Sequence, residues 1–154
     1  MVKLRAYQAE DQDAVVTLWW NSWHSIRPDL RHPHSFVGWR TRWANEIAPT
    51  QTVVVADDDG AVVGFAAADA SVGLLAQIFV DPGRKGQGIG RQLLGWAKRL
   101  MPDGFGLHTL ADNFASRGFY ERHGLVAGVT EINPVNGMMT VEYRWAPAAR
   151  PHRS

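Results

Sequence analysis

The chain has 154 residues, of which 45% are hydrophobic and 20% charged, and its formal net charge at pH 7 is +1. This length suits one domain with a full hydrophobic core, and the composition is that of an ordinary globular protein. The near-neutral charge gives no indication of a nucleic-acid surface. Cysteine is absent, which excludes disulfides, thiol nucleophiles and thiolate metal sites.

No segment of the sequence is typical of a membrane protein. No apolar run approaches the ~18 residues that a spanning helix requires, and the N-terminal MVKLRAYQAED lacks the apolar centre of a signal peptide. We therefore expect a cytoplasmic protein with neither a membrane nor a nucleic-acid partner. One domain is expected over residues 1–146, and the Pro-, Ala- and Arg-rich residues 147–154 are expected to form a flexible tail.

The first half of the chain alternates between strand-like and helix-like patterns. Acidic residues at Glu10, Asp11 and Asp13 are typical of a helix N-terminus, and Pro49 is expected to end a later helix. The run Asp57-Asp58-Asp59-Gly60 predicts a hairpin turn between two β-rich runs. The predicted elements are a strand over 2–7, a helix from Glu10 to Arg27-Pro28, a helix over 36–47, and strands over 52–56 and 61–68.

The second half is predicted to contain two helices and four strands. Leu93, Leu94 and Ala97 lie on one face at helical spacing, and Gly124 is a typical residue just after a helix. The predicted elements are a strand over 74–80, a helix over 91–100, a strand over 105–111, a helix over 113–123, and strands over 125–130 and 138–145. The resulting order, β-α-α-β-β-β-α-β-α-β-β, predicts an α+β fold with a largely antiparallel sheet flanked by helices and one crossover.

Residues 80–90, VDPGRKGQGIG, are the most informative stretch because four glycines lie between a predicted strand and a predicted helix. Glycine has no Cβ, so backbone N–H groups in such a loop can turn toward one point. The start of the helix adds unpaired N–H groups and a partial positive charge. The stretch therefore predicts a site for a phosphate or diphosphate group.

Two common nucleotide loops do not fit this stretch. A Walker loop requires Gly-Lys followed by Ser or Thr, but Lys85 follows Arg84 and precedes Gly86. A Rossmann loop requires G-x-G-x-x-G, but Arg91 stands where the third glycine after Gly86 and Gly88 belongs. The phosphate site is thus expected to serve another kind of ligand.

The run Lys85–Gly90, with Val80-Asp81-Pro82 before it, resembles the coenzyme A loop of the GNAT N-acetyltransferase superfamily, [Arg/Gln]-x-x-Gly-x-[Gly/Ala]. Lys85 departs from the first position of that pattern, and Arg84 lies one residue early. A second motif, NFASRGFYERHGL over 113–125, resembles the family's Asn-x-x-Ala-x-x-Phe-Tyr-x-x-x-Gly-Phe. In it Ser116 replaces the alanine and Leu125 the last phenylalanine. The resemblance covers nearly the whole chain and is most specific between Leu74 and Leu125.

The resemblance implies a GNAT-like fold and direct transfer of acetyl from acetyl-CoA, as co-substrate, to a primary amine on a small molecule or peptide. It implies a general-acid role for Tyr120 and a supporting role for Asn113. The residues implied to bind the coenzyme are Phe79, Val80, Lys85, Gly86, Gln87, Gly88, Ile89, Gly90, Arg91, Asn113 and Ser116. No metal is expected, and a homodimer is a family-level expectation. The alternative is a catalytically silent coenzyme A-binding module or sensor of the same fold.

The sequence leaves the general base and the acceptor pocket open. His108, in the middle of a predicted strand, titrates in the right range, and His24, Glu142 and Asp69 are weaker candidates. His32 and His34 have the spacing of a metal pair, but no third ligand is evident. Pairs such as Trp19–Trp23 and Trp39–Trp43 either pack in the core or line an aromatic acceptor pocket, and Trp20 is expected to be exposed.

Overall fold

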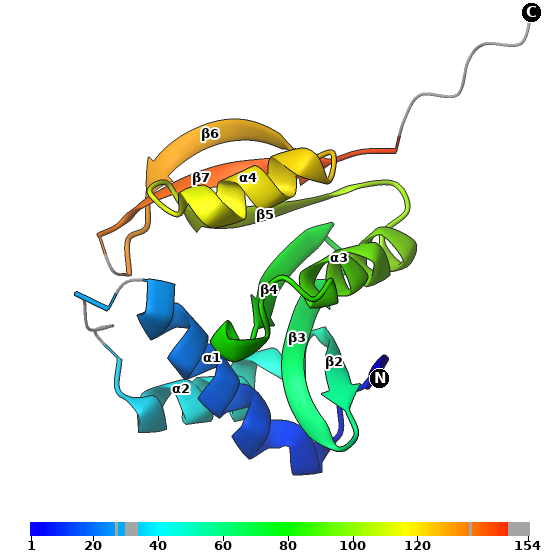
Figure 1. Cartoon of the computed structure of the whole chain (residues 1–154). Coiled ribbons are helices and arrows are strands. Elements are labelled where there is room, and N and C mark those ends of the chain that lie inside the picture. Colours follow the sequence, from blue (N-terminus) through cyan, green and yellow to red (C-terminus); the bar gives the residue numbers. More distant parts are fainter. Residues whose placement is uncertain (27, 30–33, 136, 148–154) are drawn as a thin grey trace, which may run out of the picture.

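The computed structural model describes residues 1–26, 28–29, 34–135 and 137–147. Within these residues one sheet of seven strands runs in the order β1-β2-β3-β4-β5-β7-β6, with helices on both faces (Figure 1). Of the predicted tail over 147–154, the structure describes Pro147 alone. Arg27 and His32 also lie outside the described residues.

The elements follow the predicted order, which confirms the α+β class. The first half contains β1 (Val2–Ala6), a 3-10 turn (Ala9–Asp11), α1 (Gln12–Ile26), α2 (Phe36–Arg42), a π-helical turn (Trp43–Ile47), β2 (Thr52–Asp58) and β3 (Ala61–Asp69). The second half contains β4 (Leu74–Val80), a 3-10 turn (Pro82–Arg84), α3 (Ile89–Leu100), β5 (Phe105–Leu110), α4 (Phe114–Arg122), β6 (Val126–Ile132) and β7 (Met139–Trp145).

Most predicted boundaries differ from the structure by one or two residues, and two differences change the local backbone. The helix expected over 36–47 is α-helical only to Arg42 and then widens into the π-helical turn. The expected four-residue turn at 57–60 is shorter, because β2 continues through Asp58. Asp59 and Gly60 alone reverse the chain, with φ of 51° and 94°, a left-handed pair typical of tight hairpins.

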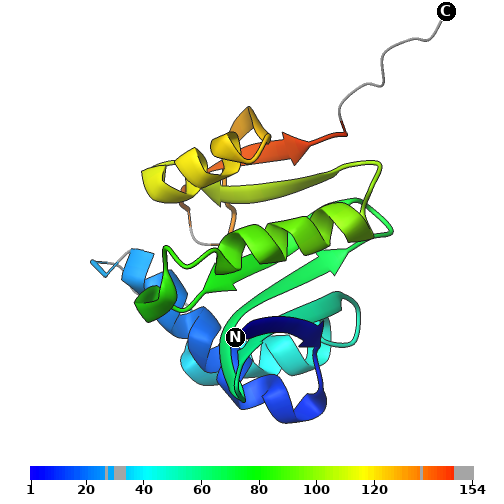
Figure 2. The ribbon, with the colours of Figure 1, turned by 45° about the vertical axis from the view of Figure 1, so that its right-hand side comes forward.

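The sheet opens in its middle, between β4 and β5. These two strands are parallel, and among the described residues they pair only at Leu74 and Gly106. The remaining neighbours in the sheet are antiparallel. Past Leu74 the two strands diverge, as Figures 1 and 2 show. One edge of β4 is therefore left without a strand partner over most of its length.

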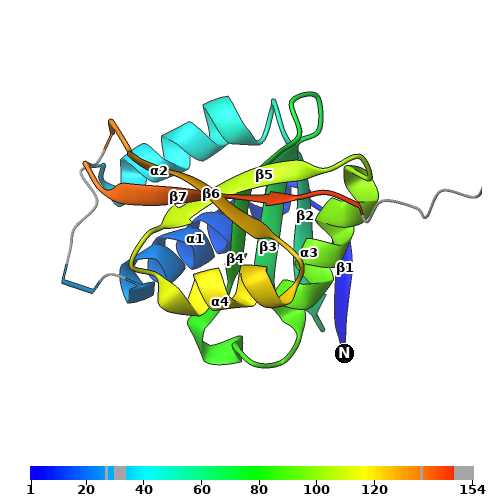
Figure 3. The ribbon, with the colours of Figure 1, turned by 90° about the horizontal axis from the view of Figure 1, so that it is seen from above.

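Two hydrophobic clusters cover the two faces of the sheet. Helices α1 and α2 bury Trp19, Trp39 and Trp43 against Phe65, whereas α3 and α4 pack on the opposite face; Figure 3 shows α2 and α4 on opposite sides of β5 and β7. Trp20, expected to be exposed, is half-buried, because its ring packs edge-on against Phe36, with centroids 5.6 Å apart. Most of the tryptophans thus hold the two N-terminal helices on the sheet.

Candidate active site

A cavity of about 770 Å³ opens where β4 and β5 diverge. Its walls come from α1, α2, β4, the glycine loop, β5, α4 and β7. Its size lies within the ~300–1,000 Å³ typical of sites for small molecules and cofactors. Segments that are far apart in the sequence meet here because the sheet leaves a gap at this position.

The glycine loop requires glycine for its backbone conformation at two positions. Gly86 and Gly88 have φ of 80° and 81°, a left-handed region that costs other residues ~1–2 kcal/mol. Gly90 serves packing instead, because a Cβ there would lie 3.3 Å from Cζ of Phe119 on α4. The first backbone bond of α3 runs from Gln92 N to Gly88 O, at 3.1 Å, so the preceding N–H groups lack helical partners at the cavity mouth.

Two charged residues beside the loop have different surroundings. The guanidinium of Arg84 forms an ion pair with Asp58 at the end of β2, and its Nε donates to Oε1 of Gln87 at 2.9 Å. Arg84 is thus held within the protein, although it also lines the cavity. Lys85 lines the cavity as well and forms no ion pair with any other described residue. Gln87, implied as a coenzyme contact, is not among the lining residues.

The open edge of β4 forms one side of the cavity. Phe79 and Val80 line it, and the carbonyl of Val80 accepts a hydrogen bond of 3.2 Å from Ser22 Oγ on α1. This bond fixes the end of β4 relative to the first helix. Backbone groups of β4 that face β5 past Leu74 have no strand partner in the described structure, so they can bond to a ligand.

Tyr120 lies between the cavity and the core. Its side chain is 6% exposed, lines the cavity and packs against Tyr143, with ring centroids 5.7 Å apart. Burial raises the pKa of Tyr120 well above the usual tyrosine value. The phenol therefore stays protonated throughout the physiological pH range, which makes it a proton donor rather than a base.

The two polar residues that precede Tyr120 in its motif also line the cavity. Asn113 Oδ1 accepts from Ser116 N at 3.2 Å and caps α4, which satisfies one backbone donor of the first turn. Both side chains face the cavity across from the glycine loop. Asn113 therefore stabilises the first turn of α4 and also lies where it can contact a ligand in the cavity.

His108 is the predicted base that the structure brings to the cavity. It lies on β5, and its Nε2 is 3.5 Å from Glu131 Oε1 and 4.0 Å from Glu142 Oε2. The other candidates lie elsewhere: Asp69 Oδ1 accepts from Ser71 N at 3.1 Å in the turn after β3, and His24 Nδ1 bonds to Trp20 O at 2.8 Å. Neither Asp69 nor His24 lines the cavity.

The sequence did not indicate several lining residues. Arg42 of α2 and Ser22 of α1 are polar positions of ordinary helices, with no motif around them. Their placement depends on how α1 and α2 pack against each other and against β4. Among the described residues, no group of three or more His, Asp or Glu side chains could hold a metal ion. Nor does any helix in the described part of the chain have the length and apolarity to span a membrane.

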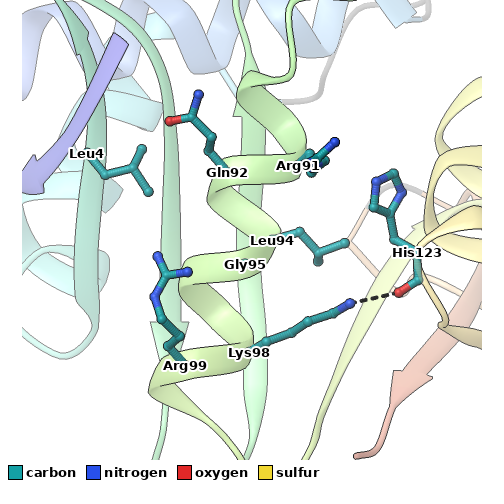
Figure 4. A pocket seen from close by; sticks show the side chains of 8 residues that line it. All are labelled: Leu4, Arg91, Gln92, Leu94, Gly95, Lys98, Arg99 and His123. Atoms are coloured by element: carbon teal, nitrogen blue, oxygen red, sulfur yellow. Dashed lines mark hydrogen bonds between the residues drawn. The ribbon is translucent and has the colours of Figure 1, made fainter.

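A smaller cavity of about 520 Å³ lies along the outer side of α3 (Figure 4). Arg91 and His123 line both cavities, so the smaller one continues from the glycine-loop end of the larger. Lys98 Nζ donates to the backbone carbonyl of His123 at 2.8 Å, which ties α3 to the end of α4. Positive charge from Arg91, Lys98 and Arg99 therefore extends along one side of α3.

A sheet opened between two parallel strands, with a glycine loop and a helix N-terminus at the opening, fits the architecture of an acyltransferase that uses a coenzyme. The chain belongs to the acetyltransferase (GNAT) family, whose sequence profile matches residues 13–125. Membership of this family supports acetyl-CoA-dependent acetyl transfer in general terms. A comparison with curated proteins gives no match.

Solved structures with similar folds cover nearly the whole chain. A GCN5-related N-acetyltransferase from Rhodopseudomonas palustris has a TM-score of 0.76 at 20% identity, over 94% of this chain and 95% of its own. YjaB from Escherichia coli gives 0.75 at 20%, over 96% and 99%. The PaiA N-acetyltransferase from Thermoplasma acidophilum, solved with coenzyme A, gives 0.73 at 16%, over 94% and 99%. At these identities the similarity concerns the fold.

Proposed function

We propose that this protein transfers the acetyl group of acetyl-CoA to a primary amine by direct attack, without a covalent enzyme intermediate. The observation that supports this most is the shared cavity: the glycine loop, the open edge of β4 and the buried Tyr120 all line it. A phosphate-binding loop alone would fit many ligands. Its combination with unpaired strand backbone and a protonated phenol fits a long phosphorylated thioester.

The residues present suit the coenzyme. N–H groups at the start of α3 and the left-handed Gly86 and Gly88 favour its diphosphate, with Lys85 and Arg91 adding positive charge. The open edge of β4 provides backbone partners for the amide groups of the pantetheine arm, with Asn113 opposite. Arg84 supports the loop through Asp58 rather than serving the phosphates.

When bound, acetyl-CoA supplies a thioester carbonyl as the electrophile. Backbone N–H groups around Phe79 and Val80 would stabilise the negative charge that develops on its oxygen. A new C–N bond forms while the C–S bond breaks, and Tyr120 gives its proton to the departing sulfur. Tyr120 then regains a proton from solvent, so the phenol is unchanged after each turnover.

The attacking amine must first lose a proton. An alkyl ammonium has a pKa of about 10, so roughly one molecule in a thousand is neutral at pH 7. His108 is the group we assign to this step, because it lines the cavity and has two carboxylates beside Nε2. Glu131 and Glu142 would stabilise the imidazolium that forms and pass the proton toward solvent.

The experiment pairs Tyr120→Phe with Tyr143→Phe, since both tyrosines are buried and adjacent but Tyr143 does not line the cavity. Thiol release from acetyl-CoA is measured over a panel of amines, and coenzyme affinity by calorimetry. Tyr120→Phe is expected to lower kcat by about 10²- to 10⁴-fold, the usual contribution of a general acid, with little change in coenzyme affinity. Tyr143→Phe is expected to lower stability but not kcat.

Two results would contradict this proposal in different ways. An unchanged kcat in Tyr120→Phe would remove Tyr120 from the mechanism. Tight binding of acetyl-CoA without acetylation of any amine would instead support a silent coenzyme-binding module.

A further inference from the structure

The side of the cavity formed by α1 and α2 has an aromatic wall. Trp19 and Trp39 are each 3% exposed, and their ring centroids lie 4.4 Å apart. Trp23 is half-buried and meets Trp39 edge-on at 6.1 Å. These three rings and Ile26 line the cavity on the side of α1 and α2. An apolar group of the size of a branched or aromatic side chain would pack against this wall.

One cation, Arg42, stands at this aromatic end. It lies at the end of α2, lines the cavity, and holds its Cζ 5.9 Å from the centroid of the Trp19 ring. Its side chain is 46% exposed, and its Nε is 3.4 Å from Glu46 Oε2. The two terminal nitrogens of a guanidinium form a fork that matches a carboxylate in two parallel hydrogen bonds, and the present partner, Glu46, has a side chain that is 69% exposed.

Arg42 is separate from the cations of the coenzyme loop. In Figure 3, α2 and the loop before α3 lie on opposite sides of β5 and β7. Lys85 and Arg91 lie at the loop, where coenzyme phosphates would neutralise them. A bound coenzyme would therefore leave Arg42 with the exposed carboxylate of Glu46 as its partner, in a weak surface ion pair that the carboxylate of a ligand can replace.

The charge of the lining excludes strongly cationic acceptors. Among the described residues, the cavity is lined by several Arg and Lys side chains and by no Asp or Glu. An aromatic wall can bind a cation, with a contribution of ~0.5–2 kcal/mol, but the guanidinium of Arg42 already lies over the Trp19 ring. A polyamine would meet repulsion there. Two carboxylates that do not line the cavity, Glu131 and Glu142, lie beside His108, the group assigned to the reacting amine.

We infer that the acceptor is an amino-carboxylate: a primary amine that also bears a carboxylate and an apolar, branched or aromatic body, as in a hydrophobic free amino acid. The inference rests on the proposed acetyl transfer and names the substrate class of the same site. The amine faces His108 and the thioester, the apolar body packs on Trp19, Trp23 and Trp39, and the carboxylate bonds to Arg42. A peptide N-terminus lacks the α-carboxylate and is a poorer fit.

The test measures thiol release at saturating acetyl-CoA with three acceptors that share a phenylethyl amine body: L-phenylalanine, L-phenylalanine amide and phenethylamine. Spermidine is included as a strongly cationic acceptor. The free amino acid is expected to have a kcat/KM about ten- to a hundredfold above the amide and phenethylamine, the effect of losing a charge-assisted hydrogen bond. The amide also represents the N-terminal residue of a peptide. Spermidine is expected to be the poorest acceptor.

The matched variants are Arg42→Met and Arg40→Met. Both residues lie in the last turn of α2, but Arg40 pairs with Asp13 at 2.8 Å and does not line the cavity. Arg42→Met is expected to lower kcat/KM for phenylalanine to the level of phenethylamine and to leave phenethylamine unchanged, whereas Arg40→Met changes neither. The quantity compared between variants is the ratio of kcat/KM for phenylalanine to kcat/KM for phenethylamine. The amines have the same pKa values in every assay, so their difference in pKa cancels in that comparison. Arg42→Lys, which keeps the charge without the fork, is expected to retain part of the preference.

Each outcome against the inference differs from failure of the proposed function. Phenethylamine or spermidine equal to phenylalanine in the wild type, or a preference that survives Arg42→Met, would overturn the amino-carboxylate class while acetyl transfer stands. Acetyl-CoA binding with no acetylation of any of the four amines would overturn the acceptor class, and only a lack of acetylation over the wider amine panel would overturn acetyl transfer as well.

Discussion

The ion pair between Arg84 and Asp58 allows a sharp test of how the coenzyme loop is held. Arg84 bonds on one side to Gln87 within the loop and on the other to Asp58 in the β2–β3 hairpin. The pair lowers the pKa of Asp58 below the usual aspartate range. Asp58→Asn removes the charge but keeps the shape, so it should release the loop from the hairpin without disturbing the sheet.

The two side chains are 31% and 22% exposed, so the ion pair is only partly shielded from solvent. If the loop is less ordered before binding, the ligand must order it, and the entropy lost in doing so lowers the affinity for the coenzyme. Loss of one such partly exposed, charge-assisted contact corresponds to about two- to tenfold weaker binding. Isothermal titration calorimetry with acetyl-CoA measures this directly.

Asp59→Asn is the matched control, because Asp59 is 91% exposed and pairs only with the N-terminal ammonium, at 3.8 Å, within the described structure. If Arg84 positions the loop, Asp58→Asn, Arg84→Gln and the double variant should weaken binding to a similar extent. If Arg84 instead binds a phosphate directly, Asp58→Asn would free it and tighten coenzyme binding, and Arg84→Gln alone would weaken it. That result would refute the positioning role.

Two further outcomes are expected from the backbone and from an internal ion pair. Gly88→Ala places a side chain at φ of 81°, so it should lower stability by ~1–2 kcal/mol and also weaken acetyl-CoA binding. Gly124→Ala, at φ of 88° outside the cavity, should lower stability by a similar amount without weakening binding. Thermal unfolding measures the stability and calorimetry the binding. Asp11 accepts from Arg5 at 2.8 and 2.9 Å, which lowers the pKa of Asp11. The stability that this ion pair adds to the folded state is therefore present above the ordinary aspartate pKa. It is lost as the pH falls through the lowered pKa that Asp11 has in the folded protein. In urea unfolding, Asp11→Asn should lower the free energy of unfolding by ~1–3 kcal/mol at pH 7 and make it depend less on pH in the acid range. If the free energies of wild type and variant fall in parallel as the pH is lowered, this account is wrong.

The sequence predicted those parts of the site that local patterns encode. The glycine loop follows a strand and opens a helix within one short stretch, so a phosphate site could be predicted there from spacing, whereas the coenzyme was implied by the resemblance. Tyr120 and Asn113 belong to a second motif of the same kind, and both line the predicted site. The order of strands and helices follows from hydrophobic periodicity, and only the ends of elements such as β2 differ.

The rest depends on packing between distant segments. Nothing near Arg84 in the sequence indicates that its partner is Asp58, on another strand. Arg42 enters the cavity because α2 packs across Trp19, and Trp20 is half-buried because Phe36 lies against it. Such contacts follow from the angle at which two helices meet, which periodicity does not specify.

The single paired position between β4 and β5 in the described structure has a consequence for the stability of the whole molecule. Among the described residues, one residue pair joins the two halves of the sheet, so a ligand along the open edge would complete hydrogen bonding that the chain leaves unfinished. Occupancy and folding are then linked: a ligand at a hundred times its Kd adds about 2.7 kcal/mol to the free energy of unfolding. The persistence of the folded chain would thus follow the local supply of coenzyme, independently of any acceptor.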